Sequence, residues 1–317
     1  MIRTACIALS AALLSGGPAL AQDGHVNHAE GHAAHSHAHA AFASDRIHVA
    51  IDGDTDGRDI ILIPGLSSSP AVWQGTVDHL VAQDGVGWRV HRIHVNGFAG
   101  APAEGNAAGP VAAPVAEEIA RYIRENGLSK PAVVGHSMGG TMGLMLAARH
   151  PDLVGRLMVV DMIPFMGAMF GPPGTTAESV KPVADQVYAA QSAAPRDQYL
   201  TQAKASVTGM IQTEAARTGP LRDVEASDQQ VSASAFRELI VTDLRPELSK
   251  ITAPVEVLYV KFNDPRMTDA ITDAVYQMSF ATLPGAKLKR IDDSAHFIML
   301  DQPQAFYGDL DAFLSAK

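Results

Sequence analysis

Residues 131–140 read PAVVGHSMGG, and this stretch decides the fold. Its first four residues form a short apolar run that predicts a buried strand, and the segment from Met138 to His150 predicts a helix. Between them the pattern Gly-x-Ser-x-Gly sets Ser137 on a sharp turn, where glycines at 135 and 139 keep neighbouring side chains from colliding. Such a turn lifts the serine hydroxyl above the sheet and places it at the positive N-terminus of the helix. We therefore predict that Ser137 is a nucleophile.

The nucleophile needs a base and an acid, because a serine hydroxyl is weakly nucleophilic at neutral pH. His296 lies on a loop between an expected strand and the last expected helix, and we predict that it is the base. The acid must hold the imidazole in the correct tautomer and stabilise the cation that forms. Asp264 follows the strand expected over residues 255–260 and gives the chain order Ser, Asp, His, so we predict it as the acid. Asp161, at the end of the preceding strand, is the alternative.

Two backbone amides must bind the oxyanion of the tetrahedral intermediate that this chemistry forms. One predicted donor is the amide of Met138, directly after the nucleophile. The other is the amide of Leu66, in the loop PGLSS after an early strand, where Gly65 allows the backbone to turn inward. His136 adjoins the nucleophile, but we expect its side chain to point away from the active face and to be structural.

Outside the motif, short β-branched runs alternate with helical stretches from residue 46 onward. Strands are expected over 46–51, 58–63, 88–95, 131–134, 154–160, 255–260 and 287–291, and helices over 71–83, 114–126, 138–150, 268–279 and 303–314. The alternation predicts a mostly parallel sheet with helices on both faces. The Asp-Gly steps within residues 52–57 predict that the first two strands form a hairpin, which would be the antiparallel edge of this sheet.

Residues 163–250 break this rhythm, because they hold helix-like patterns with no strand among them. An insertion of this size between two sheet strands is expected to be a helical cap over one end of the sheet. The α/β core is then expected over residues 46–162 and 251–317. The insertion begins with an apolar and flexible segment. We predict that this segment binds substrate through Phe165, Met166, Met169 and Phe170, and the alternative is that these residues pack the cap against the core.

The N-terminus has the layout of a secretory signal over residues 1–21. A single Arg3 precedes an apolar stretch, helix-breaking glycines and a proline, and small residues at Ala19 and Ala21. A membrane anchor is the alternative, but the apolar stretch is short for a span. The sequence therefore predicts an exported, periplasmic chain that loses its single cysteine, Cys6, with the signal.

Residues 22–45 form a tail in which histidines are separated mainly by Ala, Gly, Ser and Asn. This composition offers little for a core and predicts disorder. Neutral imidazoles ligate zinc, copper or nickel, and a flexible chain can gather several of them. We expect either a solvated spacer or weak metal binding, the candidate ligands being His25, His28, His32, His35, His37 and His39.

Composition excludes several classes of function for this chain of 317 residues. Its 47% hydrophobic positions can form a large core. Its net charge of -10 disfavours binding to nucleic acid, which is also anionic. Apart from the N-terminal segment no apolar run is long enough to span a bilayer, so we expect no stable membrane insertion.

Taken together, residues 46–317 resemble the α/β-hydrolase superfamily, in its capped, lipase- or esterase-like serine branch. The stretches that carry the resemblance are Ile60–Trp73, Gly97–Gly100, Val133–Gly140, Val255–Asp264 and Asp292–Pro303. A serine at position 137, where dehalogenase and epoxide-hydrolase relatives carry aspartate, argues against those two chemistries. Pro64 stands where many relatives have a histidine before the oxyanion glycine, which leaves the backbone donor in place but changes the local loop.

These observations predict an exported serine hydrolase that cleaves an apolar carboxylic ester through an acyl-enzyme, with no cofactor. A lactonase or an amidase or peptidase would use the same groups and stays an alternative. A second alternative, of another class, is a periplasmic metal-binding protein that acts through the histidine-rich tail.

Overall fold

The computed structural model describes residues 42–83, 87–264 and 266–316. The predicted signal sequence and the six histidines of the predicted tail lie outside the described residues. Within the described parts of the chain, no helix has both the length and the apolar character needed to cross a bilayer.

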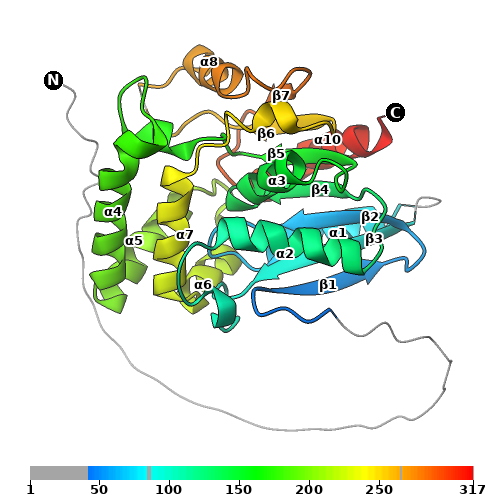
Figure 1. Ribbon diagram of the computed structural model, residues 1–317, viewed down its shortest axis with the longest axis horizontal. Helices are drawn as coiled ribbons and strands as arrows, with labels where there is room; N and C mark the ends of the chain where they lie inside the picture. The colour runs from blue at the N-terminus through cyan, green and yellow to red at the C-terminus, as the bar shows by residue number, and fades with distance from the viewer. Residues whose placement is uncertain (1–41, 84–86, 265, 317) are drawn as a thin grey trace, which may run out of the picture. The chain divides into compact units, whose positions relative to one another are not determined.

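The framework is a seven-stranded sheet in the order β1-β3-β2-β4-β5-β6-β7, in which every pair is parallel except β1 with β3 (Figure 1). The predicted parallel sheet is therefore confirmed. The strands are β1 (Ile47–Gly53), β2 (Arg58–Ile63), β3 (Trp88–Val95), β4 (Ala132–His136), β5 (Arg156–Val160), β6 (Val255–Tyr259) and β7 (Lys287–Arg290).

The predicted hairpin of the first two strands is wrong, although β1 is the expected antiparallel edge. β3 lies between β1 and β2, pairing antiparallel with the first and parallel with the second. The connection from β1 to β2 crosses the start of β3, where the amides of Asp54 and Arg58 donate to the carbonyls of Trp88 and Gly87. The turn residues thus hydrogen-bond to the start of β3, which comes later in the chain, and a local turn pattern does not reveal this arrangement.

Both faces of the sheet are covered, and alternate residues of each strand point to opposite faces. On one face Ile61 and Ile63 of β2 pack in a core with α2 (Ala112–Glu125), α3 (Met138–Arg149) and α8 (Asp269–Ser279). On the other face Ile60 and Leu62 pack with η1 (Pro70–Trp73), α1 (Gln74–Val81), α9 (Ile298–Asp301) and α10 (Pro303–Ser315). Burial on both sides explains why the central strands are continuously apolar.

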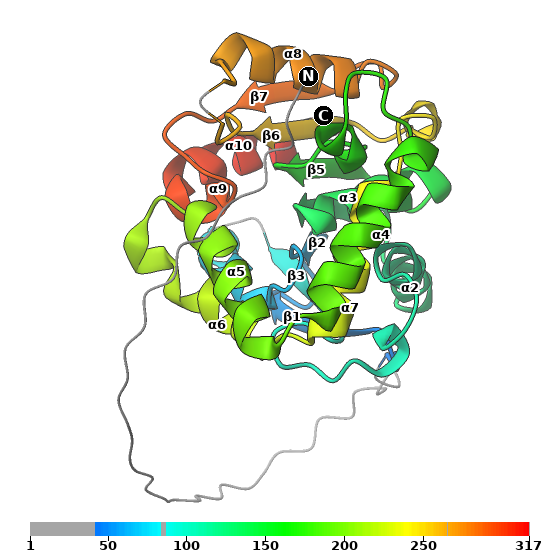
Figure 2. The ribbon, with the colours of Figure 1, turned by 90° about the vertical axis from the view of Figure 1, so that its left-hand side faces the viewer.

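Residues 163–250, here called the helical insertion, connect β5 to β6, and the expected absence of strands from this described segment is confirmed. Its main helices are α4 (Ala177–Ala193), α5 (Arg196–Gly209), α6 (Thr218–Ala226) and α7 (Gln229–Val241). In Figure 1 they gather beyond the arrowhead of β2, and Figure 2 faces that end of the sheet. The insertion therefore stands at the carboxyl ends of the parallel strands, where the loops of an α/β sheet carry ligands.

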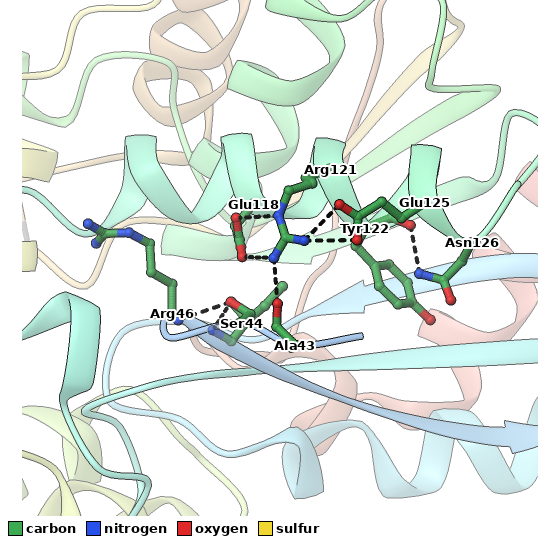
Figure 3. A network of polar contacts seen from close by, with 9 residues as sticks. Ala43, Ser44, Arg46, Glu118, Arg121, Tyr122, Glu125 and Asn126 are labelled. Atoms are coloured by element: carbon green, nitrogen blue, oxygen red, sulfur yellow. Dashed lines mark hydrogen bonds and ion pairs between the residues drawn. The ribbon is translucent and has the colours of Figure 1, made fainter. Parts of the chain in front are cut away.

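The chain just before β1 is fastened to α2 by Arg121 (Figure 3). The guanidinium of Arg121 donates to the carbonyl of Ala43 at 2.7 Å and to the carboxylates of Glu118 and Glu125. It also lies 4.3 Å over the ring of Phe42. These contacts fix the edge strand β1 to the helical layer that covers the sheet.

Candidate active site

Ser137 stands on a strained turn between β4 and α3. Its backbone has φ 54° and ψ -121°, a conformation that a residue other than glycine adopts only at a cost in conformational energy. A Cβ on Gly139 would lie 2.2 Å from the carbonyl oxygen of Ile63, and one on Gly135 would lie 2.2 Å from that of Gly139. Only glycines fit these two positions, which explains the Gly-x-Ser-x-Gly spacing. The turn leaves Ser137 partly exposed at the carboxyl end of a central strand.

His296 lies on the loop between β7 and α9, and its partner is Asp161. The Nδ1 atom of His296 is 2.6 Å from Oδ2 of Asp161, which follows β5 directly. The Asp161 side chain is only 9% exposed and that of His296 is 23% exposed, so this pair is shielded on one side and open on the other. An acidic acceptor at Nδ1 holds the ring proton there and leaves Nε2 free to take a proton.

The predicted pairing of Asp264 with His296 is wrong. Asp264 lies in an exposed loop, where the guanidinium of Arg266 donates to its carboxylate at 2.5 and 2.9 Å. This hydrogen bond and charge hold the pKa of Asp264 down at about 2. Because β5 and β6 are neighbours in the sheet, both aspartates follow strands that end at the same edge. A pair with Arg266 holds Asp264 at the surface, and the alternative considered from the sequence, Asp161, meets the histidine.

The loop after β2, residues 64–69, lies against the turn of Ser137, the predicted nucleophile. A Cβ on Gly65 would lie 3.1 Å from the Cβ of Ser137, so the backbone of Gly65 is packed against the turn. Leu66 is the next residue along this loop. Among the described residues, the amides of Leu66 and Met138 donate no hydrogen bond within the protein. Both are therefore available to an incoming oxygen, and Pro64 does not prevent the loop from lying against Ser137.

The helical insertion contacts this predicted oxyanion loop, residues 64–69, from the other side. The hydroxyls of Ser67 and Ser232 of α7 are 2.8 Å apart. The backbone amide and the hydroxyl of Ser69 both donate to the carboxylate of Asp223 of α6, at 2.8 and 2.7 Å. The position of the loop is thus set by the insertion as well as by the sheet.

His136 connects the end of β4 to the loop that carries His296, a contact that the sequence did not indicate. Its ring is fully buried, and its Nε2 donates to the carbonyl oxygen of His296 at 3.0 Å. Burial, with the nearby His296 as a second cause, holds the pKa of His136 well below its usual value, so the ring stays neutral. The two rings lie 4.6 Å apart. His136 therefore fixes the backbone of the predicted base.

Asp301 is a second residue that sequence analysis missed. Its carboxylate accepts from the amide of Ala295, next to His296, at 2.9 Å. It also accepts from the amides of Gln212 and Thr213 of the helical insertion, at 3.1 and 2.8 Å. One side chain thus links the histidine loop to the insertion, over a separation along the chain that no local motif could indicate.

Of the four predicted substrate-binding residues, three pack against apolar neighbours and one is exposed. Phe165 is 1% exposed and belongs to the insertion's own core with Val180, Ala184 and Ile240. Phe170 packs against Phe236, and Met166 fills the space between this core and the sheet core. Met169 is exposed to solvent. These positions favour the packing alternative for Phe165, which is enclosed in the core of the insertion. Met166 and Phe170 are only partly buried, and Phe170 also lines a surface pocket with residues 171–175.

A metal site is not evident in the described parts of the chain, where no three histidine, cysteine, aspartate or glutamate side chains cluster closely enough to hold an ion. The candidate ligands of the tail lie outside these residues.

The chain belongs to the alpha/beta hydrolase fold family, which it matches over residues 60–303. This match confirms the resemblance inferred from the sequence. The strained serine turn and the histidine–aspartate pair at the carboxyl edge of the sheet agree with membership of that family.

Known proteins similar to the chain are esterases and other hydrolases. It is 26% identical over 258 residues to the pimeloyl-[acyl-carrier protein] methyl ester esterase of Vibrio cholerae, covering 81% of this chain and 94% of that one. A hydrolase structure from Pseudomonas aeruginosa superposes with a TM-score of 0.69 at 20% identity, covering 85% and 94% of the two chains. The enol-lactonase of Burkholderia xenovorans superposes with a TM-score of 0.66 at 21% identity, covering 85% and 96%. The two structures share the fold with this chain.

Proposed function

We propose that this protein is a serine hydrolase that cleaves carboxylic esters through an acyl-enzyme, with Ser137, His296 and Asp161 as its catalytic triad. The observation that carries the proposal is the 2.6 Å contact between His296 and Asp161, whose neighbour Val160 accepts from the amide of Ser137 at 2.9 Å. Esterases among the similar proteins support the same class of reaction.

In the acylation step, the Ser137 hydroxyl oxygen attacks the ester carbonyl carbon while Nε2 of His296 takes the hydroxyl proton. The amides of Leu66 and Met138 bind the oxyanion that develops. When the intermediate collapses, the bond to the alcohol oxygen breaks, the alcohol leaves with the proton from His296, and the acyl group stays on Ser137. Asp161 accepts from Nδ1 throughout and stabilises the imidazolium.

In the deacylation step, water takes the place of the alcohol. His296 removes a proton from the water as its oxygen attacks the acyl carbon, and the same two amides bind the second oxyanion. Collapse of this intermediate breaks the bond to Ser137 and returns the proton to its oxygen. The acid is released and the enzyme is restored, so no external reagent besides water is needed.

The helical insertion is proposed to act as a cap over this site. Its contacts with the oxyanion loop, through Ser232 and Asp223, and with the histidine loop, through Asp301, support this role. We also propose that the predicted signal sequence directs export to a periplasm, which cell fractionation of the full-length chain can test.

A panel of p-nitrophenyl esters, lactones and peptides tests the proposed reaction. Wild type should turn over esters faster than the other two classes, and Ser137→Ala should lose this activity while folding normally. Ser315→Ala, which changes an exposed serine at the end of α10, is the matched control and should behave as wild type. A fast lactone or peptide reaction that needs Ser137 would replace the ester assignment. Ester turnover by Ser137→Ala at the wild-type rate would overturn the triad.

A further inference from the structure

Both carboxylate oxygens of Asp161 are occupied, and they have different partners. Oδ2 contacts Nδ1 of His296 at 2.6 Å. Oδ1 accepts from the hydroxyl of Tyr276 at 2.9 Å and from the backbone amide of Val260 at 3.1 Å. We propose that Tyr276 is a positioning residue for catalysis, whose hydroxyl sets the rotation of the Asp161 carboxylate so that Oδ2 points at His296. This inference rests on the proposed triad and extends it by one residue.

The ring of Tyr276 is held so that its hydroxyl has one direction. Tyr276 is 2% exposed on α8, and its ring stacks on that of Tyr259 at 4.0 Å with an interplanar angle of 19°. The ring of Phe262 lies on it as well, at 5.8 Å. A ring fixed by two aromatic neighbours loses little freedom when its hydroxyl bonds, so the hydrogen bond constrains its acceptor effectively.

The surroundings of the Tyr276 hydroxyl keep it protonated. Burial, together with the negative charge of Asp161, raises the pKa of Tyr276 well above its usual value. The neutral phenol therefore persists, and it has a proton to donate to the carboxylate. Buried hydrogen bonds to a charged acceptor are stronger than those between neutral groups.

The conformation of Asp161 explains why a second support is useful. Its backbone has φ 53°, an uncommon value for a residue other than glycine, so the carboxylate projects from a strained strand end. Its own amide donates to Leu258 at 2.7 Å, which fixes the backbone but not the side-chain rotation. Rotation of the carboxylate is restricted by the donors to Oδ1, and Tyr276 supplies the only side-chain donor to that oxygen among the described residues.

Tyr259 offers a matched control, because it is the same residue type in the same aromatic stack. Its hydroxyl donates to Asp273 at 2.9 Å, a carboxylate that is paired with Arg290 and not with a triad residue. Tyr276→Phe and Tyr259→Phe each remove one hydroxyl and keep the ring. The variants therefore differ in whether the lost bond reaches Asp161.

The test measures kcat and KM for a p-nitrophenyl ester with the full chain. For Tyr276→Phe we expect kcat to fall about five- to tenfold with KM unchanged, since the hydroxyl acts on the base and not on the substrate. Tyr259→Phe should keep both constants. Equal melting temperatures of the two variants would show that the loss does not come from unfolding. A wild-type kcat for Tyr276→Phe, or a loss confined to KM, would overturn the inference.

A double-mutant cycle with Asp161→Asn separates positioning from a general structural effect. If Tyr276 acts through Asp161, adding Tyr276→Phe to Asp161→Asn should not lower the residual kcat any further. The same five- to tenfold loss in both backgrounds would contradict the inference. The cycle also isolates the proposed function: full activity of Asp161→Asn would refute the triad itself. An inactive Asp161→Asn beside a fully active Tyr276→Phe would refute the role of Tyr276 alone.

Discussion

Asp161→Asn should nearly abolish ester hydrolysis, because an amide cannot satisfy the donors that surround this side chain. Asp161 accepts from Tyr276, Val260 and His296, and a carboxylate has oxygens for all three. If the asparagine oxygen faces Tyr276 and Val260, its amino group faces Nδ1 of His296. The ring proton must then move to Nε2, the atom that has to receive the proton of Ser137.

The opposite orientation of the asparagine is unfavourable as well. It would restore an acceptor to His296 but would turn the amino group toward two buried donors, at a cost of roughly 1–3 kcal/mol for each group left without a partner. The wrong tautomer is therefore favoured, and we expect kcat to fall about 10⁴-fold, which corresponds to about 5 kcal/mol in the activation free energy.

Asp264→Asn is the matched control, because it removes the same charge from the neighbouring strand end. Its carboxylate is paired with Arg266 in an exposed loop, so kcat/KM should stay within about twofold of wild type. The assay is steady-state hydrolysis of a p-nitrophenyl ester, with circular dichroism to verify folding. If Asp264→Asn loses most of the activity and Asp161→Asn keeps it, the assignment of the acid made from the geometry is refuted.

Two further predictions concern the attachment of the helical insertion and the N-terminal tail. The buried carboxylate of Glu238 accepts from the amides of Val111, Ala112 and Ala113 at the start of α2, at 2.5, 2.7 and 2.8 Å. Glu238→Gln should lower the free energy of unfolding in urea by about 1–3 kcal/mol, because it removes the charge from the N-terminus of α2 and turns an amide donor toward backbone donors. Glu225→Gln, which changes an exposed glutamate of α6, is the control and should alter the free energy of unfolding little. An equal loss for both variants would contradict this reasoning. Deletion of residues 22–41 should leave kcat/KM unchanged, and so should addition of a chelator to the full chain. Calorimetric titration with zinc or nickel should show weak binding to the full chain that the deletion removes. Loss of hydrolysis on deletion or chelation would place the tail in the mechanism.

The parts of the site that local sequence could indicate were those set by short-range sterics. The turn at Ser137 requires glycines two residues before and after it, so its pattern is legible in one stretch of chain. The alternation of strands and helices predicted the parallel sheet for the same reason, since burial on both faces makes each central strand an apolar run. His296 could be proposed because it lies on the loop between the last expected strand and the last expected helix, where the base must lie.

The identity of the acid could not be decided from the sequence, because Asp161 and Asp264 both follow strands that end at the same edge. The deciding contacts are a salt bridge from Arg266 to Asp264 and a hydrogen bond from Tyr276 to Asp161. The second of these joins residues 115 positions apart. The order in which β1, β2 and β3 pair is non-local in the same way.

The apolar segment at the start of the helical insertion illustrates a different limit. Phe165 and Phe170 suit a substrate pocket and a packed core equally well by composition. The four helices of the insertion must bury an apolar face of their own, and these side chains meet that need. Which role a large apolar residue takes depends on neighbours that only the assembled helices supply.

Covalent labelling by a serine-directed phosphonate, mapped by mass spectrometry of the digested protein, tests the central claim most directly. The account predicts one adduct, on the peptide that contains Ser137, formed in proportion to the loss of ester hydrolysis. Asp161→Asn should label far more slowly than wild type, and Asp264→Asn should label at the wild-type rate. An adduct on another residue, or full inhibition with Ser137 unmodified, would contradict the assignment of Ser137 as the nucleophile.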